Sequence, residues 1–211
     1  MVIAQIPAEQ RVLLHNIAWD LYERLLESNP DSSSPRLTYD QGELEAMSPS
    51  AEHERLNRAI QLLVSLVAYE LGIRISSLGS TTFRRQEIQR GFEPDSCFYV
   101  QNLDRVRGKR TIDLRIDPPP DLVVEIDISS PSIPKLPIFA EFGVPEVWRH
   151  ADGVLQILAL QEGQYVPASV SRVLPSVTAA ALNELLAESR DLDDTEWIER
   201  IRAWARRIGR S

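Results

Sequence analysis

The chain has 211 residues, of which 43% are hydrophobic and 26% charged, and this composition predicts a soluble globular protein with one substantial core. Its single cysteine, Cys97, excludes an intramolecular disulfide and favours a reducing, cytoplasmic location. The three scattered histidines exclude a Cys/His zinc site, and no run approaches the roughly 18 apolar residues of a membrane span. A net charge of −8 argues against a protein that holds DNA through many phosphate contacts.

Helical and strand patterns follow one another in the first third of the chain. Apolar residues near helical spacing predict an amphipathic helix over residues 9–27. Residues 36–47 have the pattern of two short strands joined by a hairpin turn at Asp40-Gln41-Gly42. The clearest helix spans residues 52–71, and Gly72 follows it as a C-terminal stop. Its apolar stripe consists of Leu56, Ile60, Leu63, Val64, Val67 and Leu71.

Three polar residues near the start of this helix are candidates for a functional role. His53 lies in the first turn, where it could act as a base, contact phosphate, or serve as a surface or capping residue. Glu43 and Glu52 are candidates for a carboxylate that lies upstream in the sequence and contributes to a functional site. The alternative for each is a solvated surface charge.

Basic residues gather in two stretches of the middle of the chain. The first contains Arg84, Arg85 and Arg90, and the second, a polar loop, contains Arg105, Arg107, Lys109 and Arg110. The loop could follow a nucleic-acid backbone or could simply be an exposed, solvated loop. A strand is expected at residues 97–100 and a further short strand at residues 111–116.

The most informative stretch covers residues 118–148. Three prolines open it, and residues 122–128 then alternate as in a strand with one apolar face. Glu125 and Asp127 fall on the same side, with Cα atoms roughly 6.5 Å apart. Two carboxylates so close on a core strand repel each other, and a divalent cation is the usual compensation. The alternative is an edge strand whose polar face meets water.

Two neighbours of this strand add chemistry to the carboxylates. Upstream, Pro94-Asp95 leads into the strand at residues 97–100, and downstream Lys135 begins a short helix over residues 135–142. One acid before a strand, two acids on the next strand and a nearby lysine suit metal-assisted phosphodiester hydrolysis. Carboxylates bind Mg²⁺, or Mn²⁺ in its place, and the metal lowers the pKa of a bound water. A lysine can orient that water or neutralise charge that develops on phosphorus.

The last quarter of the chain predicts strands followed by two helices. A strand is expected at residues 146–149, and a hairpin at residues 154–160 and 165–170. The final helix spans residues 194–208, and Asp193 with Glu196 has the pattern of a capping box. Trp197 and Trp204 on this helix could mark a homodimer contact. Its arginine-rich end indicates either a docked helix with a solvated face or a nucleic-acid contact.

A P-D motif followed about thirty residues later by E-x-D, with a displaced lysine, resembles the PD-(D/E)XK nuclease superfamily. The flanking sequence resembles the Uma-two family of restriction-endonuclease-like proteins, which is common in cyanobacteria. The segments that carry this resemblance are YDQGELEAMSPSAEHERLNRAI, RGFEPDSCFYVQN, DPPPDLVVEIDISSPS and KLPIFAEFGVPEVWRH. The resemblance implies one α/β (α+β) domain over residues 1–211 with a central mixed β-sheet flanked by helices. Its core would cover about residues 36–186, with the helix at about 194–208 packed on it.

The resemblance also implies a function: a Mg²⁺-dependent endonuclease that hydrolyses DNA. Asp95, Glu125 and Asp127 would bind the metal, and Lys135 would replace the superfamily's strand lysine, whose position Asp127 occupies. The start of the helix at residues 52–71 would bring His53 to the site. One alternative is a catalytically inactive nuclease-like protein that binds DNA or a protein partner. Another is a metal-independent hydrolase that uses Glu125 and Asp127 as acid and base on a non-nucleic substrate.

Overall fold

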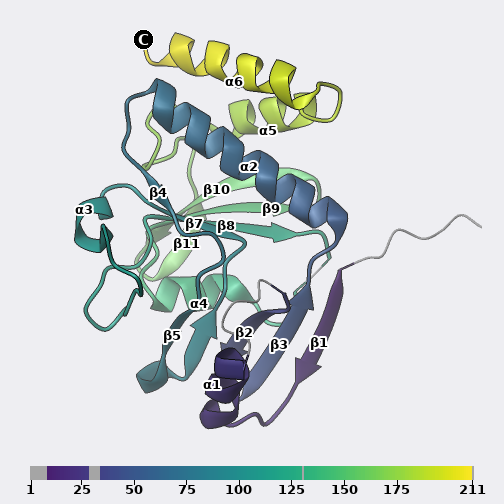
Figure 1. The fold of residues 1–211 in the computed structure, drawn as a ribbon, viewed down its shortest axis with the longest axis vertical. Coiled ribbons are helices and arrows are strands. Elements are labelled where there is room, and N and C mark those ends of the chain that lie inside the picture. The colour runs from purple at the N-terminus through teal and green to yellow at the C-terminus, as the bar shows by residue number, and fades with distance from the viewer. Residues whose placement is uncertain (1–8, 29–33, 130, 211) are drawn as a thin grey trace, which may run out of the picture.

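The computed structural model describes residues 9–28, 34–129 and 131–210 and contains two β-sheets with helices packed against them (Figure 1). The larger sheet has six strands and carries the most informative strand at its centre. In spatial order its strands are β11 (Gln164–Pro167), β10 (Val154–Gln161), β9 (Glu146–Ala151), β8 (Leu122–Asp127), β7 (Ser96–Tyr99) and β4 (Ser76–Ser77). This architecture confirms the predicted α/β (α+β) class and the central mixed sheet flanked by helices.

Only one pair in the larger sheet is parallel. β8 and β9 run in the same direction, and α4 (Lys135–Glu141) lies in the connection between them. A parallel pair needs such a crossover, because the chain must return to the end of the sheet at which the first strand began before the second strand can start. The crossover places the first residue of α4 beside the C-terminal end of β8, where Glu125 and Asp127 lie.

The smaller sheet is antiparallel throughout and was not predicted as a separate layer. In spatial order its strands are β1 (Gln10–Leu14), β3 (Glu43–Ser48), β2 (Arg36–Asp40), β6 (Arg90–Phe92) and β5 (Phe83–Arg85). The predicted hairpin turn is confirmed: Gln41 and Gly42 both have positive φ, at 50° and 101°, as a tight two-residue hairpin turn requires.

The helix predicted over residues 9–27 is wrong in its first half. Residues 10–14 form β1, which pairs with β3, and the helix α1 begins only at Trp19 and ends at Ser28. Val12 and Leu13 fit both the helical and the strand periodicity. Pairing with the edge of β3 selects the strand. The strand predicted at residues 111–116 is also wrong, because these residues form turns and bends without a ladder.

Three helices lie on one side of the larger sheet, and the last of them packs against the other two rather than on the sheet (Figure 1). They are α2 (Ala51–Glu70), α5 (Ala179–Glu188) and α6 (Asp194–Ile208). Val124 and Ile126 of β8 point into this layer, together with buried side chains of α2. The capping box predicted for α6 is present, with Asp193 and Glu196 each accepting from the other's backbone N–H.

The opposite face of the larger sheet is covered by α4 and by part of the smaller sheet. Val123 of β8 packs there against Phe139 of α4 and Phe92 of β6. Because side chains alternate along a strand, Glu125 and Asp127 also belong to this face. The remaining short elements are α3 (Leu103–Val106), within the predicted polar loop, and the 3-10 turn η1 (Gln86–Ile88). Within these described ranges, no helix has the length and apolar character needed to cross a membrane.

Candidate functional site

Glu125 and Asp127 lie on a strand that is buried on both faces. β8 runs between β7 and β9, and all six of its residues are buried. The side chain of Glu125 is 2% exposed and that of Asp127 is 5% exposed. The alternative of an edge strand with a wet polar face is therefore wrong. Two carboxylates on an interior strand need compensating partners, because burial penalises the charged form.

Lys135 is one of those partners. It is the first residue of α4, and its Nζ forms an ion pair with Oε1 of Glu125. The lysine side chain is only 4% exposed, so its charge is balanced within the protein rather than by water. The lysine ammonium thus reaches the carboxylates from the helix that follows the strand, while Asp127 stands at the third position of E-x-K.

Asp95 is the second acid that the fold brings to this strand. It directly precedes β7, in which Ser96 pairs with Val124, so Asp95 lies opposite Glu125. Its Oδ2 accepts a hydrogen bond from the backbone N–H of Ile126 at 2.6 Å. The pairing of β7 with β8 therefore brings together Asp95 and Glu125, which are thirty positions apart in the sequence. This is the arrangement that the P-D and E-x-D motifs predict for a shared site.

Behind Asp95 lies a buried cluster that contains His53. Oδ1 of Asp95 forms an ion pair with Arg36 and lies 3.2 Å from Nε2 of His53. The His53 side chain is fully buried, so the alternative of a surface histidine is wrong, although its backbone N–H does donate to the cap residue Ser50 at 3.1 Å. Arg36 also pairs with Glu54 at 2.7 Å. Sequence reasoning missed Arg36, because nothing in a strand-forming segment marks one arginine as buried.

The upstream acids lie at other positions than predicted. Glu43 and Glu52 are exposed. Glu45 on β3, which the sequence analysis did not single out, is only 1% exposed. Its Oε1 pairs with Arg11 at 2.8 Å, and its Oε2 accepts from the backbone N–H of Ser132 at 2.5 Å. Glu45 therefore fixes the loop between β8 and α4, which carries Lys135 into place.

Glu9 is a second buried acid that the sequence analysis missed. Its Oε2 accepts from the backbone N–H and the hydroxyl of Ser129 at 3.1 and 2.7 Å, just after β8. Its Oε1 has no hydrogen-bond partner among the described residues and lies 3.6 Å from Nε2 of His53. The helix predicted over residues 9–27 hid this role, since it placed Glu9 on a helix rather than at a strand start.

The three central charges have displaced pKa values. Burial raises the pKa of Glu125, with Lys135 opposing the rise and the charges of Asp95 and Asp127 adding to it. Burial also acts to raise the pKa of Asp95, but the hydrogen bond and charge of His53 hold it below its usual value. Burial acts to lower the pKa of Lys135, and the negative charges of Glu125 and Asp95 outweigh that effect. The surroundings therefore favour the charged form of Asp95, whereas burial opposes the charged form of Glu125.

A cavity of about 370 Å³ opens onto these groups. Its polar lining is Glu125, Asp127, Lys135 and Arg149, and its apolar lining is Pro131, Pro134, Leu136, Pro137 and Phe139. Neither Asp95 nor His53 lines it, because both lie deeper in the protein. A substrate in this cavity would meet the two carboxylates of β8 and the two cations first.

The donor chemistry of the site suits a hard divalent cation. Oε2 of Glu125 and Oδ1 of Asp127 are buried and have no hydrogen-bond partner within the described ranges. In the same part of the chain, no three His, Cys, Asp or Glu side chains are gathered closely enough to enclose a metal. Mg²⁺ does not need such a cage, since it keeps several waters and binds through one or two carboxylates and substrate phosphates. The two orphaned oxygens fit that mode of binding.

Comparison with known families assigns the chain. The Uma2 (Uma-two) family model, described as "Putative restriction endonuclease", matches residues 19–190, which is more than half of the chain. The chain belongs to the Uma2 family. This match confirms the family resemblance and the restriction-endonuclease-like fold that it implies. None of the curated proteins compared with the chain matches it.

The Uma2 match runs from α1 to just beyond α5 and therefore includes every predicted site residue. Asp95, Glu125, Lys135 and His53 all lie within it, whereas Glu9 lies before its start. At the level of the family, the description is that of a nuclease.

Several residues of the two basic stretches of this Uma2 chain interact with other groups of the protein. Arg90 pairs with Asp40 at 2.8 Å, and the Arg85 guanidinium lies over the Phe142 ring at 4.7 Å. Lys109 pairs with Asp117. The other basic residues of the second stretch, Arg105, Arg107 and Arg110, are exposed. None of the residues of the two stretches lines the cavity at β8.

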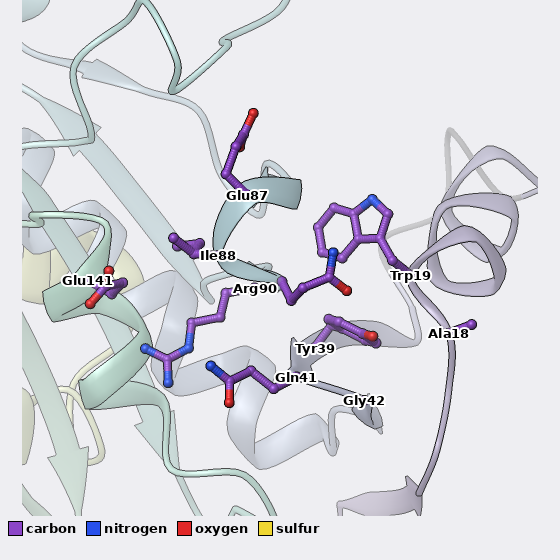
Figure 2. A pocket seen from close by; sticks show the side chains of 10 residues that line it. Ala18, Trp19, Tyr39, Gln41, Gly42, Glu87, Ile88, Arg90 and Glu141 are labelled. Carbon is purple, nitrogen blue, oxygen red and sulfur yellow. The ribbon is translucent and has the colours of Figure 1, made fainter.

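A larger hollow of about 860 Å³ lies elsewhere on the Uma2 fold, between α1, the β2–β3 turn, η1 and the end of α4 (Figure 2). Figure 2 shows Trp19, Tyr39, Gln41 and Arg90 around it. The hollow contains none of the predicted site residues and no pair of buried carboxylates. Size alone does not make it the candidate site, because the buried acids and the lysine gather at β8 instead.

Proposed function

We propose that this protein is a Mg²⁺-dependent endonuclease that hydrolyses phosphodiester bonds of DNA, with Mn²⁺ able to replace Mg²⁺. The observation that carries the proposal is the meeting of Glu125, Asp127 and Lys135 at a cavity, with Asp95 directly behind them. Membership of a family described as restriction endonucleases supports the same reading. Location in the cytoplasm is part of the proposal and agrees with a single, unpaired cysteine.

Each residue has a role in this proposal. The free Oε2 of Glu125 and Oδ1 of Asp127 would hold the metal, and Asp95 would complete its carboxylate set. The bound metal would supply a water of lowered pKa and a positive charge next to the phosphate. Lys135 would neutralise charge that develops on the phosphate oxygens or orient the attacking water, since its ammonium lies at the same carboxylate.

His53 would act through Asp95 rather than on the substrate. It is buried, does not line the cavity, and lies 3.2 Å from Oδ1 of Asp95. By holding the pKa of Asp95 low, His53 would keep this acid ionised, which is the form that binds a metal ion.

The test is plasmid cleavage. Supercoiled plasmid incubated with protein and Mg²⁺ should be nicked or linearised, and EDTA should abolish the reaction. Endonucleolytic attack is required, because a closed circle has no ends. Glu125→Gln and Asp95→Asn should each lower the cleavage rate by at least a hundredfold. Asp113→Asn, at a partly exposed acid that does not line the cavity, is the matched control and should cleave like the unaltered chain.

A second function is favoured by one observation on Asp95. Its two carboxylate oxygens are engaged by Arg36, His53 and the backbone N–H of Ile126, so this acid must exchange partners before it can bind metal. An inactive nuclease-like protein that binds DNA or a protein partner would keep such a closed arrangement. Binding of DNA without cleavage in both Mg²⁺ and Mn²⁺ would support this second function and contradict the first.

A further inference from the structure

Arg149 is a charged residue of the cavity to which the sequence analysis gave no role. It lies on β9, where the parallel register pairs it with Glu125 of β8. Its Nε donates to Oδ2 of Asp127 at 2.7 Å. The Asp127 side chain is 5% exposed and that of Arg149 is 32% exposed, so the pair is anchored at its acidic end and open at its basic end.

The open end of Arg149 has unused hydrogen-bonding capacity. The guanidinium presents five N–H donors in a planar fork, and only the Nε–H has a partner among the residues that the structure describes. Its Nη1 and Nη2 groups belong to a side chain that lines the cavity together with Lys135. Two parallel N–H donors of this kind match the oxygens of a phosphate group, which accept two hydrogen bonds side by side.

The pair also accounts for the acid at the third position of E-x-D. A lysine at position 127 would place a flexible point charge there, whereas Asp127 fixes the orientation of a planar cation. An arginine held in this way loses less side-chain freedom when it binds an anion.

We propose that Arg149 binds a phosphate group of the nucleic-acid strand in this cavity, and that Asp127 is the positioning residue that aims it. The class of ligand rests on the proposed nuclease function. The Arg149–Asp127 pair involves only residues of this chain, and the phosphate contact proposed for Arg149 does not depend on a bound metal. A phosphate contact carries no base information, so the effect of Arg149 should be the same for every DNA sequence.

The experiment measures binding of a fluorescein-labelled DNA duplex by anisotropy, in EDTA and at several salt concentrations, so that neither cleavage nor metal contributes. Arg149→Gln should weaken binding roughly 10-fold. It should also reduce, by about one, the steepness with which the logarithm of the association constant falls with the logarithm of the salt concentration. Two duplexes of unrelated sequence should show the same loss. Arg149→Lys should fall between, because it keeps the charge but loses the fork.

The matched control is Arg74→Gln. Arg74 forms an exposed pair with Asp104 at 2.5 Å and lies beyond the C-terminal end of α2, whereas the candidate site lies near the N-terminal end of that helix. This change removes the same charge and should leave the affinity unaltered. An equal loss in both variants would mean that only net charge matters, and it would overturn the proposal.

Asp127→Ala separates positioning from charge. Removal of an acid should strengthen DNA binding if only net charge counts. If Asp127 aims Arg149, the same change should weaken binding instead, and Asp127→Asn, whose amide oxygen can still accept from Nε, should restore most of it. Stronger binding by Asp127→Ala would contradict the positioning role.

The two proposals fail in different ways. Arg149-dependent binding without any plasmid cleavage would remove the hydrolytic function and leave the phosphate contact. Cleavage with identical DNA binding by Arg149→Gln and the unaltered chain, including no measurable binding by either, would overturn the phosphate contact and leave the nuclease.

Discussion

Lys135 forms a buried ion pair with Glu125, which lies ten positions earlier on the neighbouring strand. The two side chains are 4% and 2% exposed, so neither charge is balanced by water. The pair joins the first turn of α4 to the centre of the larger sheet. It therefore has a structural consequence as well as the catalytic role proposed for both residues.

Replacement of Lys135 by methionine should destabilise the protein. Removal of one partner leaves a buried carboxylate without its cation, and we expect the free energy of unfolding to fall by about 3 kcal/mol at pH 7. Urea unfolding followed by circular dichroism measures the change. In the double variant Lys135→Met with Glu125→Gln, most of the loss should be recovered, because no unpaired charge remains.

Lys109→Met provides the matched control. Lys109 also pairs with an acid, Asp117, but its side chain is 40% exposed. The side chain of Asp117 is only 5% exposed, but its Oδ2 still accepts from the backbone N–H of Asp113 at 3.0 Å, so the change should cost clearly less than the loss of Lys135. Equal costs for the two lysines would contradict the importance that we give to burial at Lys135.

Gly91→Ala tests a close approach between β6 and α1. A Cβ at Gly91 would lie 2.2 Å from the hydroxyl oxygen of Tyr22, although the backbone conformation there is ordinary. Tyr22 is fully buried within an aromatic cluster, so it cannot move aside easily. We expect a loss of about 1–3 kcal/mol in the free energy of unfolding.

Tyr22→Phe should relieve part of this clash. The hydroxyl of Tyr22 is buried and has no hydrogen-bond partner among the described residues, so the phenylalanine variant alone should lose little stability. Combined with Gly91→Ala, it should recover part of the loss, because the nearest contact is with the hydroxyl. Additive losses in the double variant would show that the clash is not the cause.

Asp193→Ala should weaken the attachment of α6. The Asp193 side chain accepts from the backbone N–H groups of Thr195 and Glu196 at 2.8 and 2.9 Å, which satisfies two donors at the helix start. We expect a cost of about 1 kcal/mol, measured by thermal unfolding. Asp194→Ala is the control, since this neighbouring exposed acid makes no comparable cap, and it should cost clearly less.

The stability of the protein should fall at alkaline pH because of Cys97. Burial raises the pKa of its thiol to about 12, whereas an unfolded thiol ionises near 8.5. Above pH 9 the unfolded chain therefore loses a proton that the folded chain keeps, which favours unfolding. Between pH 8 and pH 10 the loss due to this residue should be about 2 kcal/mol.

Comparison with Cys97→Ala isolates that loss. The cavity left by the alanine lowers stability by an amount that does not depend on pH, so the difference between the two proteins should shrink as the pH rises from 8 to 10. Urea unfolding in reducing buffer measures both proteins at each pH. A constant difference would contradict the raised pKa of the thiol.

Local sequence patterns were sufficient to predict an element where one hydrophobic periodicity or one motif dominated the segment. The helix over residues 52–71, the turn at Gln41-Gly42 and the capping box at Asp193 and Glu196 are all confirmed, because short-range geometry decides each of them. The alternation around Glu125 and Asp127 correctly put both acids on one face. The strand that the sequence placed at residues 111–116 has no partner in the sheet, and pattern alone could not reveal that.

Tertiary structure decided what surrounds those acids. The sequence by itself determined the strand, the two carboxylates, the P-D motif and the lysine, since side-chain periodicity and residue type are local properties. It did not determine that β8 is central, that Arg36, Glu9 and Glu45 are buried beside the site, or that Arg149 holds Asp127. Those facts depend on which strand edges pair and on the register between them, and pairing between distant segments is settled only by the packing of the whole chain.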